Sequence, residues 1–173
     1  MMSEGYLAVE KSPEYTERVR NARYKGVYRL PPYWFGAGTD QAALDDYVFG
    51  KYKDKEGLIP NFELARDLFR KFGASSQKME IIYARALKPG SARNRVSGIY
   101  ELLGFDVACG TPFWSPAADL PTDGAVEIFA QRLNQNGLYK NFDDAAEYLD
   151  AYRARWLKDE TIVLKIWEVY QVK

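Results

Sequence analysis

Two stretches of the sequence are similar to each other at a shift of 80 residues, and this similarity constrains the fold more than any other feature. Residues 24–88, aligned without gaps on residues 104–168, give 14 identities in 65 pairs. About four identities are expected by chance at this composition. The matches include a Pro-aromatic-Trp segment and a longer motif, Gly-Leu-x-x-Asn-Phe-x-x-Ala, which begins at Gly57 and again at Gly137. An internal duplication of this length predicts a fold of two similar units.

The longer motif predicts the start of a helix in each half. Asn61 and Asn141 are favourable N-caps, because the side-chain oxygen of Asn accepts a hydrogen bond from a backbone N–H two or three residues later. Acidic residues follow in the first turn, where the helix dipole favours them. After each helix comes a segment rich in β-branched and aromatic residues. The predicted elements are helices over 62–72 and 142–157 and strands over 79–87 and 160–172.

Helical spacing of apolar residues predicts further elements upstream in each half. The apolar stripe of one such helix, 94–103, consists of Val96, Ile99, Tyr100 and Leu103, and that of another, 123–136, includes Phe129 and Leu133. The upstream elements are helices over 13–23 and 94–103, short strands over 25–30 and 105–109, and second helices over 40–52 and 123–136.

The predicted fold class is therefore α+β, with two similar αβααβ halves packed into one domain. The halves span about 13–88 and 94–172, and a basic Pro/Gly loop at 88–95 joins them within a single compact domain, 1–173. Four strands are too few to bury themselves, so we expect one sheet that is covered by helices and in which strands of the two halves pair.

Composition excludes several classes of function. The chain has no His, which removes Ser-His-Asp and Cys-His catalysis and His-ligated zinc. Its single Cys, Cys109, lacks the neighbouring His base that would activate a thiol nucleophile. Lys and Arg total 24 and Asp and Glu also total 24, so no net charge attracts nucleic acid or an anionic membrane. No apolar run is long enough for a signal peptide or a membrane span.

The candidate binding residues are those at which the two halves differ. Trp34 and Trp114 occupy equivalent positions and are best explained by folding. The aromatic loop around Tyr33 and Phe35 is bulkier in the first half, because Ser115 replaces the phenylalanine in the second. Aromatic residues and arginines dominate interface hot spots. The basic joint adds Arg93 and Arg95, so the predicted partner-binding residues are Tyr33, Phe35, Arg93 and Arg95.

The predicted function is a non-enzymatic protein-binding module in the cytoplasm, such as a small inhibitor or an immunity-type protein that neutralises a bacterial toxin. The expected partner is another protein, with no cofactor, metal, nucleic acid or membrane. The alternative is a small enzyme that works without His, with Asp, Glu, Arg and Tyr groups in the cleft between the halves. Carboxylates are numerous, but no spacing selects a catalytic pair.

Overall fold

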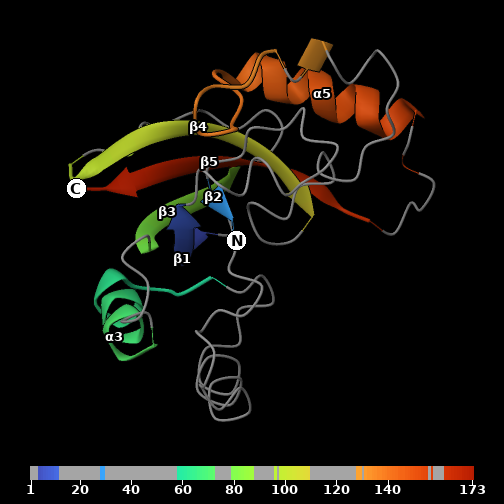
Figure 1. Cartoon of the computed structure of the whole chain (residues 1–173). Coiled ribbons are helices and arrows are strands. Elements are labelled where there is room, and N and C mark those ends of the chain that lie inside the picture. Colours follow the sequence, from blue (N-terminus) through green and yellow to red (C-terminus); the bar gives the residue numbers. More distant parts are fainter. Residues whose placement is uncertain are drawn as a thin grey trace.

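The described part of the chain forms an antiparallel sheet and two helices (Figure 1). The computed structural model describes residues 4–11, 28–29, 58–72, 79–87, 96, 98–109, 128–129, 131–155, 157 and 162–173. The strands are β1 (Glu4–Lys11), β2 (Tyr28–Arg29), β3 (Met79–Leu87), β4 (Tyr100–Cys109) and β5 (Leu164–Val172). The helices are α3 (Phe62–Phe72) and α5 (Phe142–Arg155). The α+β class expected from the sequence is thereby confirmed.

The order of the strands brings the two parts of the chain together at the centre of the sheet. The order is β2-β1-β3-β5-β4, with four long strands and the two-residue β2 at one edge. Strand β3 pairs with β5, so that Ala84 lies opposite Val169 and Arg85 opposite Glu168. The expectation that strands from both halves pair in one sheet is confirmed by this ladder.

Both helices pack on the same face of the sheet, which we call the helix face. Residues directly opposite in a ladder share a face, and the register aligns Tyr6, Tyr83 and Tyr170 across β1, β3 and β5. Helix α3 packs on this face through Ala65 against Tyr6, and α5 packs on it through Ala145 against Phe105. Figure 1 shows α3 beside β1 and β3, whereas α5 lies by β4 and β5. The helices therefore occupy opposite ends of the strand order.

The opposite face of the sheet is buried as well. Leu7, Val9, Ile82, Trp167 and Val169 have no exposed surface there and belong to one apolar cluster. A strand buried on both sides reads as a nearly continuous apolar run rather than an alternating one. This burial explains why the segment that contains β5 carries the densest β-strand signal in the sequence.

The same local arrangement of a strand, a backbone bridge and a helix start occurs twice among the described residues, in β1, α3 and β3 and again in β4, α5 and β5, and we call each set a unit. In the first unit, Tyr6 and Ile59 exchange two backbone hydrogen bonds of 2.8 and 2.9 Å. In the second, Phe105 and Tyr139 exchange two of 2.9 and 2.8 Å. A glycine precedes the aromatic residue in each case. The helix begins three residues after the bridge in both units, and the following strand takes a central place in the sheet.

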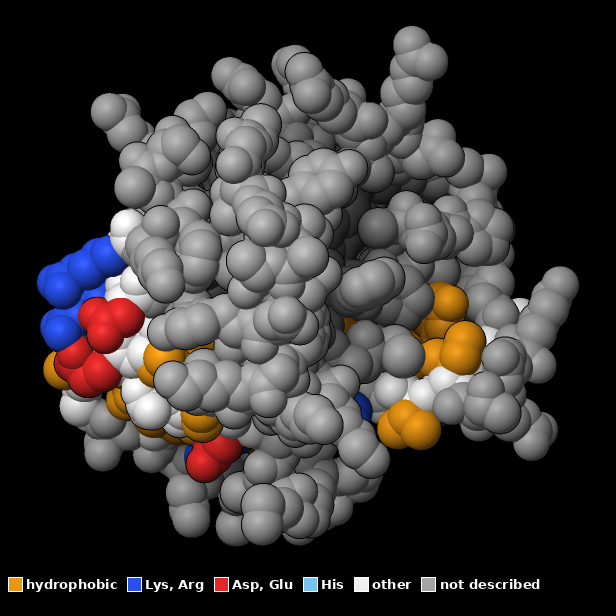
Figure 2. Space-filling model, turned by 90° about the horizontal axis from the view of Figure 1, so that it is seen from below, with side chains coloured by type: hydrophobic (Ala, Val, Ile, Leu, Met, Phe, Trp, Pro, Cys, Tyr) orange, Lys and Arg blue, Asp and Glu red, His pale blue; other side chains and the backbone are white. Residues whose placement is uncertain are grey.

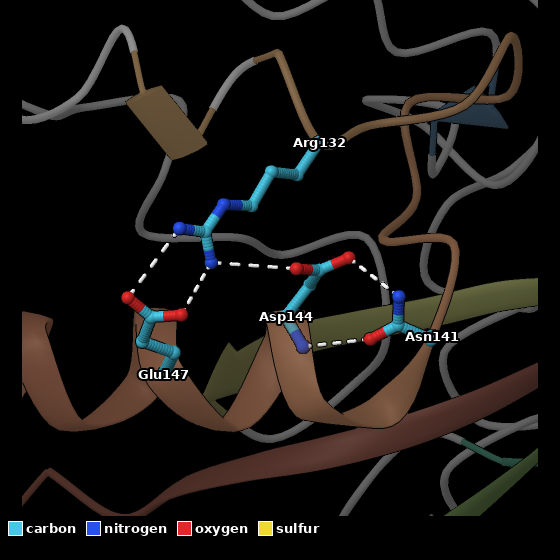
Figure 3. A network of polar contacts seen from close by, with 4 residues as sticks. All are labelled: Arg132, Asn141, Asp144 and Glu147. Carbon is cyan, nitrogen blue, oxygen red and sulfur yellow. Dashed lines mark hydrogen bonds and ion pairs between the residues drawn. The ribbon is translucent and has the colours of Figure 1, made fainter.

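The predicted Asn caps are confirmed. The Asn61 Oδ1 atom accepts a hydrogen bond of 2.9 Å from the Leu64 N–H, and the Asn141 Oδ1 atom accepts one of 2.8 Å from the Asp144 N–H. The Asn141 Nδ2 group also donates to the Asp144 Oδ2 atom at 2.7 Å. Figure 3 shows that Asp144 in turn contacts Arg132, which also pairs with Glu147. The start of α5 is therefore tied to the preceding loop.

Asn141→Ala is expected to lower the free energy of unfolding by about 1–2 kcal/mol, and Asn61→Ala by about 1 kcal/mol. The larger value belongs to Asn141, because its loss also releases Asp144 from the network of Figure 3. Urea denaturation of the single variants measures both effects. Asn→Ser at each position retains a capping oxygen and serves as the control. An alanine variant as stable as its serine counterpart would contradict the capping role.

The helix predicted over 94–103 is wrong: Val96, Gly98 and Ile99 are not helical, and Tyr100–Leu103 lie in β4. A β-bulge explains the misleading pattern: Leu102 lies opposite Tyr170 and Gly104 opposite Val169, so one extra residue is inserted between them. The insertion changes the period-2 alternation of apolar residues and creates a spacing of three that resembles a helix.

The helix predicted over 123–136 does not extend to its predicted end. Ile128 and Phe129 have helical backbone, but residues 131–139 form turns, and Leu133 bridges Tyr139 instead of lying on a helix face. The Asn134 side chain organises these turns: its Oδ1 atom accepts hydrogen bonds from the N–H groups of Asn136 and Leu138. Such side-chain bonds compete with helix formation. Gly137, at a φ of 72°, completes the turn.

The shift of 80 residues relates Ile59 to Tyr139 and one helix start to the other, but it does not relate their bridge partners, Tyr6 and Phe105, which are 99 residues apart. Gly104 in β4 has its structural counterpart at Gly5 in β1, a strand that the sequence analysis did not predict. Of the strand predicted over 25–30, Tyr28–Arg29 form β2, which pairs with β1 at the edge of the sheet. Ile82 is buried in β3, whereas its aligned residue Ile162 is exposed and precedes β5. The predicted helices 13–23 and 40–52 and the loop 88–95 lie outside the described residues.

Candidate functional site

The four residues predicted to bind a partner, Tyr33, Phe35, Arg93 and Arg95, lie outside the described residues, so their role stays a prediction. The backbone of Cys109 ends β4. Asp144, an acidic residue of the first helical turn after Asn141, contributes to the start of α5 (Figure 3). The candidate site is therefore built from residues that the sequence analysis did not single out.

Two rows of residues cross the helix face from strand to strand. The first row consists of Tyr6, Tyr83, Tyr170 and Leu102, which lie opposite one another in β1, β3, β5 and β4. The second row, adjacent to it, consists of Glu4, Arg85, Glu168 and Phe105. The register of the ladders alone places these side chains together, although they come from four strands that are far apart in the sequence.

Four tyrosines form a connected group, which we call the tyrosine cluster: Tyr6, Tyr83, Tyr100 and Tyr170. The Tyr83 ring lies at its centre, with centroid distances of 5.3 Å to Tyr6, 5.1 Å to Tyr100 and 6.0 Å to Tyr170. The Tyr6 and Tyr100 hydroxyl oxygens are 2.5 Å apart, and the Tyr83 hydroxyl donates to the Glu4 Oε2 atom at 2.8 Å. Tilted rings at these separations attract each other beyond their simple burial.

The pKa values of the Tyr6, Tyr83 and Tyr170 hydroxyls are raised, which keeps these three groups protonated at neutral pH. Burial and the hydrogen bond with Tyr100 raise the pKa of Tyr6, and burial and the hydrogen bond with Glu4 raise that of Tyr83. Burial, followed by repulsion from the Glu168 carboxylate, raises the pKa of Tyr170 to about 12. A phenol that acts as a general base needs a pKa closer to neutral. These tyrosines are therefore suited to donating hydrogen bonds and to contact, rather than to abstracting protons.

An ion pair lies beside the tyrosine cluster at the junction of β3 and β5. The Arg85 Nε and Nη2 groups donate to the Glu168 Oε2 atom at 2.9 and 2.5 Å. The two side chains are 12% and 6% exposed, respectively. Interaction with Glu168 raises the pKa of Arg85 against the opposing effect of burial. The two opposite charges neutralise each other at the centre of the sheet, and the Glu168 carboxylate is held by hydrogen bonds from Arg85.

An exposed apolar side chain lies at the margin of the tyrosine cluster. Leu102, which ends the tyrosine row, is 46% exposed. Ile99, just before β4, is 50% exposed, and its pairing with Lys173 places it on the other face, with Glu101. Tyr100 lies between them in the sequence and contacts Tyr6, Tyr83 and Tyr170. The N-terminal end of β4 thus presents Leu102 to solvent next to a rigid aromatic layer.

Another part of the surface is charged with both signs. The exposed side of α3 carries the ion pairs Glu63–Arg66 and Asp67–Arg70, each formed by residues three positions apart. Figure 2 shows red and blue side chains gathered on the side where α3 lies. Exposed pairs of this kind contribute little stability and generate no field of one sign. We interpret this surface as a solvated helix face.

The described residues show neither a metal site nor a membrane-spanning helix. Within the described ranges, no group of three or more Cys, Asp and Glu side chains is arranged to hold a metal ion. In the same part of the chain, no helix combines the length and apolar character needed to cross a bilayer. Comparisons with protein-family models, with curated proteins and with solved structures find no match.

Proposed function

We propose that this protein is a cytoplasmic, non-enzymatic protein-binding module and that its binding surface includes the tyrosine cluster with Leu102. The observation that carries the proposal is the position of exposed Leu102 opposite Tyr170, beside four tyrosines that already contact one another. Tyrosine is among the residues that contribute most to protein interfaces. A small inhibitor or an immunity-type protein that neutralises a toxin is the class of module that we propose.

Preorganisation supports this surface as a binding surface. Ordering a side chain on association costs about 0.5–1.5 kcal/mol. The rings of Tyr83 and Tyr100 are held by neighbouring rings, and the hydroxyl of each has a partner within the cluster or on Glu4. The side chains of Tyr83 and Tyr100 therefore lose little conformational freedom when a partner docks. Leu102 supplies an apolar group at the end of the same row.

We also propose that the predicted residues Tyr33, Phe35, Arg93 and Arg95 contribute to partner binding. Aromatic anchors and arginines that pair with acidic groups complement the apolar and hydroxyl groups of the tyrosine cluster. In the calorimetric titration described below, Phe35→Ala and Arg95→Ala are each expected to weaken binding of the partner by about 1–3 kcal/mol.

Leu102→Ser is expected to weaken binding of the partner by about 1–3 kcal/mol without lowering the melting temperature appreciably. The partner is first isolated by affinity capture from cells that express the tagged protein, and its affinity is then measured by titration calorimetry. Ile128→Ser is the matched control, because Ile128 is an exposed apolar residue (56% exposed) and adjoins Phe129, which packs on α5 rather than on the tyrosine cluster. Equal affinity of the Leu102→Ser variant and the wild type would overturn the proposed surface.

We further propose that the two units descend from one duplicated βαβ unit. The shared features are a Gly-aromatic pair in a strand, two reciprocal backbone hydrogen bonds to the segment before the helix, and an Asn cap. If the units are equivalent, Gly5 and Gly104 both allow the bridging segment to approach the strand closely. Alanine substitutions at the two glycines test this equivalence.

A further inference from the structure

The outer edge of β4 carries backbone groups that point away from its neighbour β5. The Lys173 N–H donates to the Ile99 carbonyl at 2.8 Å, which makes residues 99 and 173 a hydrogen-bonded pair. Hydrogen-bonded and non-hydrogen-bonded positions alternate along an antiparallel ladder. The N–H and C=O groups of Tyr100 and Leu102 therefore point away from β5. Among the described residues, none forms a backbone hydrogen bond with these outward groups.

The open part of this edge has a defined length. Further along β4, the Asn134 Nδ2 group donates to the Leu103 carbonyl at 2.7 Å. Phe105 is occupied by its two backbone bonds with Tyr139. The edge is thus closed by the loop 131–140 from Leu103 onward. Tyr100 and Leu102 offer two donors and two acceptors, enough for an added strand of three to five residues.

The side chains at this edge specify the chemistry of an added strand. On the helix face, Tyr100 and Leu102 present an aromatic and an apolar group, and Glu101 points to the other face, where it forms an exposed ion pair of 3.1 Å with Lys173. A second copy of this chain paired antiparallel about Glu101 would place two glutamates directly opposite each other. Like charges opposite each other destabilise a ladder, whereas opposite charges stabilise it. The edge therefore favours a different protein with a basic residue at that position.

We propose that an extended segment of a partner protein adds to the sheet along Tyr100–Leu102, with a Lys or Arg opposite Glu101 and apolar residues on either side of it. This mode rests on the proposed protein-binding function and names the way in which the partner docks. Strand addition of this kind gains affinity from backbone hydrogen bonds and specificity from alternate side chains. Exposed strand edges are ready templates for such pairing.

The test uses the full chain, labelled with ¹⁵N, and two synthetic probe peptides. One is acetyl-Thr-Val-Lys-Val-Thr-amide, and the other has Glu in place of Lys. The Lys-centred peptide is expected to shift the amide resonances of Tyr100 and Leu102, to slow their exchange with solvent, and to bind about tenfold more tightly than the Glu-centred peptide. In the Glu101→Lys variant the preference is expected to reverse.

A proline substitution separates backbone from side-chain recognition. Leu102→Pro removes an outward N–H, which leaves the hydrogen bonds to β5 intact and is tolerated on an edge strand. It is expected to weaken binding of the Lys-centred peptide about tenfold relative to Leu102→Ser, which keeps the N–H. The melting temperature of each variant reports its folding. If Leu102→Pro unfolds, the reversal in Glu101→Lys and the exchange rates of Tyr100 and Leu102 decide the question.

Failure of this inference is distinguishable from failure of the proposed function. Loss of partner binding in Leu102→Ser together with no resonance shift and no exchange protection by either peptide would leave the binding module in place and overturn strand addition. Equal binding of the two peptides, unaffected by Glu101→Lys, would overturn the charge rule. A concentration-dependent dimer that Leu102→Pro abolishes, detected by analytical ultracentrifugation, would identify a second copy as the occupant and also overturn the proposal. Peptide binding with the expected preference, but no protein partner, would support the edge and count against the function.

Discussion

Replacing Arg85 by alanine is expected to lower the free energy of unfolding by about 3–5 kcal/mol. The variant leaves the Glu168 carboxylate, which is 6% exposed, without the two donors that now contact its Oε2 atom. An uncompensated charge at the centre of a sheet is far more costly than a missing apolar contact. Chemical denaturation monitored by tryptophan fluorescence measures the loss.

Two further variants isolate the cause of this loss. Arg70→Ala removes an arginine from an exposed pair in α3, whose atoms are 4.0 Å apart, and is expected to cost less than about 0.5 kcal/mol. Arg85→Met combined with Glu168→Leu removes both charges and keeps apolar volume, so stability is expected to recover relative to Arg85→Ala. A double variant as unstable as Arg85→Ala would show that the unpaired charge is not the cause of the loss.

Gly104→Ala is expected to lower the free energy of unfolding by about 3 kcal/mol, through overpacking and backbone strain together. A Cβ atom at this position would lie 2.8 Å from the Leu138 Cβ atom and 2.8 Å from the Tyr139 carbonyl oxygen. The φ angle of 148° is one that other residues rarely adopt. The same denaturation experiment measures the effect.

Alanine substitutions at two other glycines separate the contributions of overpacking and of backbone strain to this loss of stability. At Gly5 a Cβ atom would meet the Ile59 carbonyl oxygen at 2.8 Å and the Leu58 Cβ atom at 2.9 Å, so Gly5→Ala reports the steric part, about 1–3 kcal/mol. At Gly98, with a φ of 96° and no atom within 4 Å, alanine reports the strain alone, about 1 kcal/mol. The expected order of destabilisation is Gly104, then Gly5, then Gly98. A Gly5→Ala variant as stable as the wild type would argue against equivalent units.

Local signals in the sequence were sufficient to predict the helices that begin at an Asn cap and the strands that are rich in β-forming residues. Asn61 and Asn141 set the starts of α3 and α5, and β3 was predicted over its full observed range. Strand β5 was predicted too, although it begins at Leu164 instead of residue 160. Capping and β-propensity act within a few residues, and they are therefore legible without the partner elements.

The candidate site was not predictable in the same way. Tyr6, Tyr83, Tyr100 and Tyr170 come from four strands, and only the ladder register brings them together. Each one, read in the sequence, is an ordinary aromatic residue of a strand. The bulge at Leu103 made the start of β4 resemble a helix in the sequence, so Tyr100 was not predicted to lie in a strand. The turns around Asn134 were not predicted either, because the Asn134 side chain that organises them also contacts β4.

The place of β5 in the sheet has a consequence for how the protein is made. Among the strands that the structure describes, β5 comes last along the chain, yet it lies between β3 and β4 and pairs with both. While a ribosome is still synthesising residues 164–172, the inner edges of β3 and β4 have no strand to pair with. Unpaired apolar edges are the regions through which nascent chains aggregate. The sheet therefore closes late and over long sequence separations, which predicts slow folding and an interval in which chaperones protect the unfinished chain.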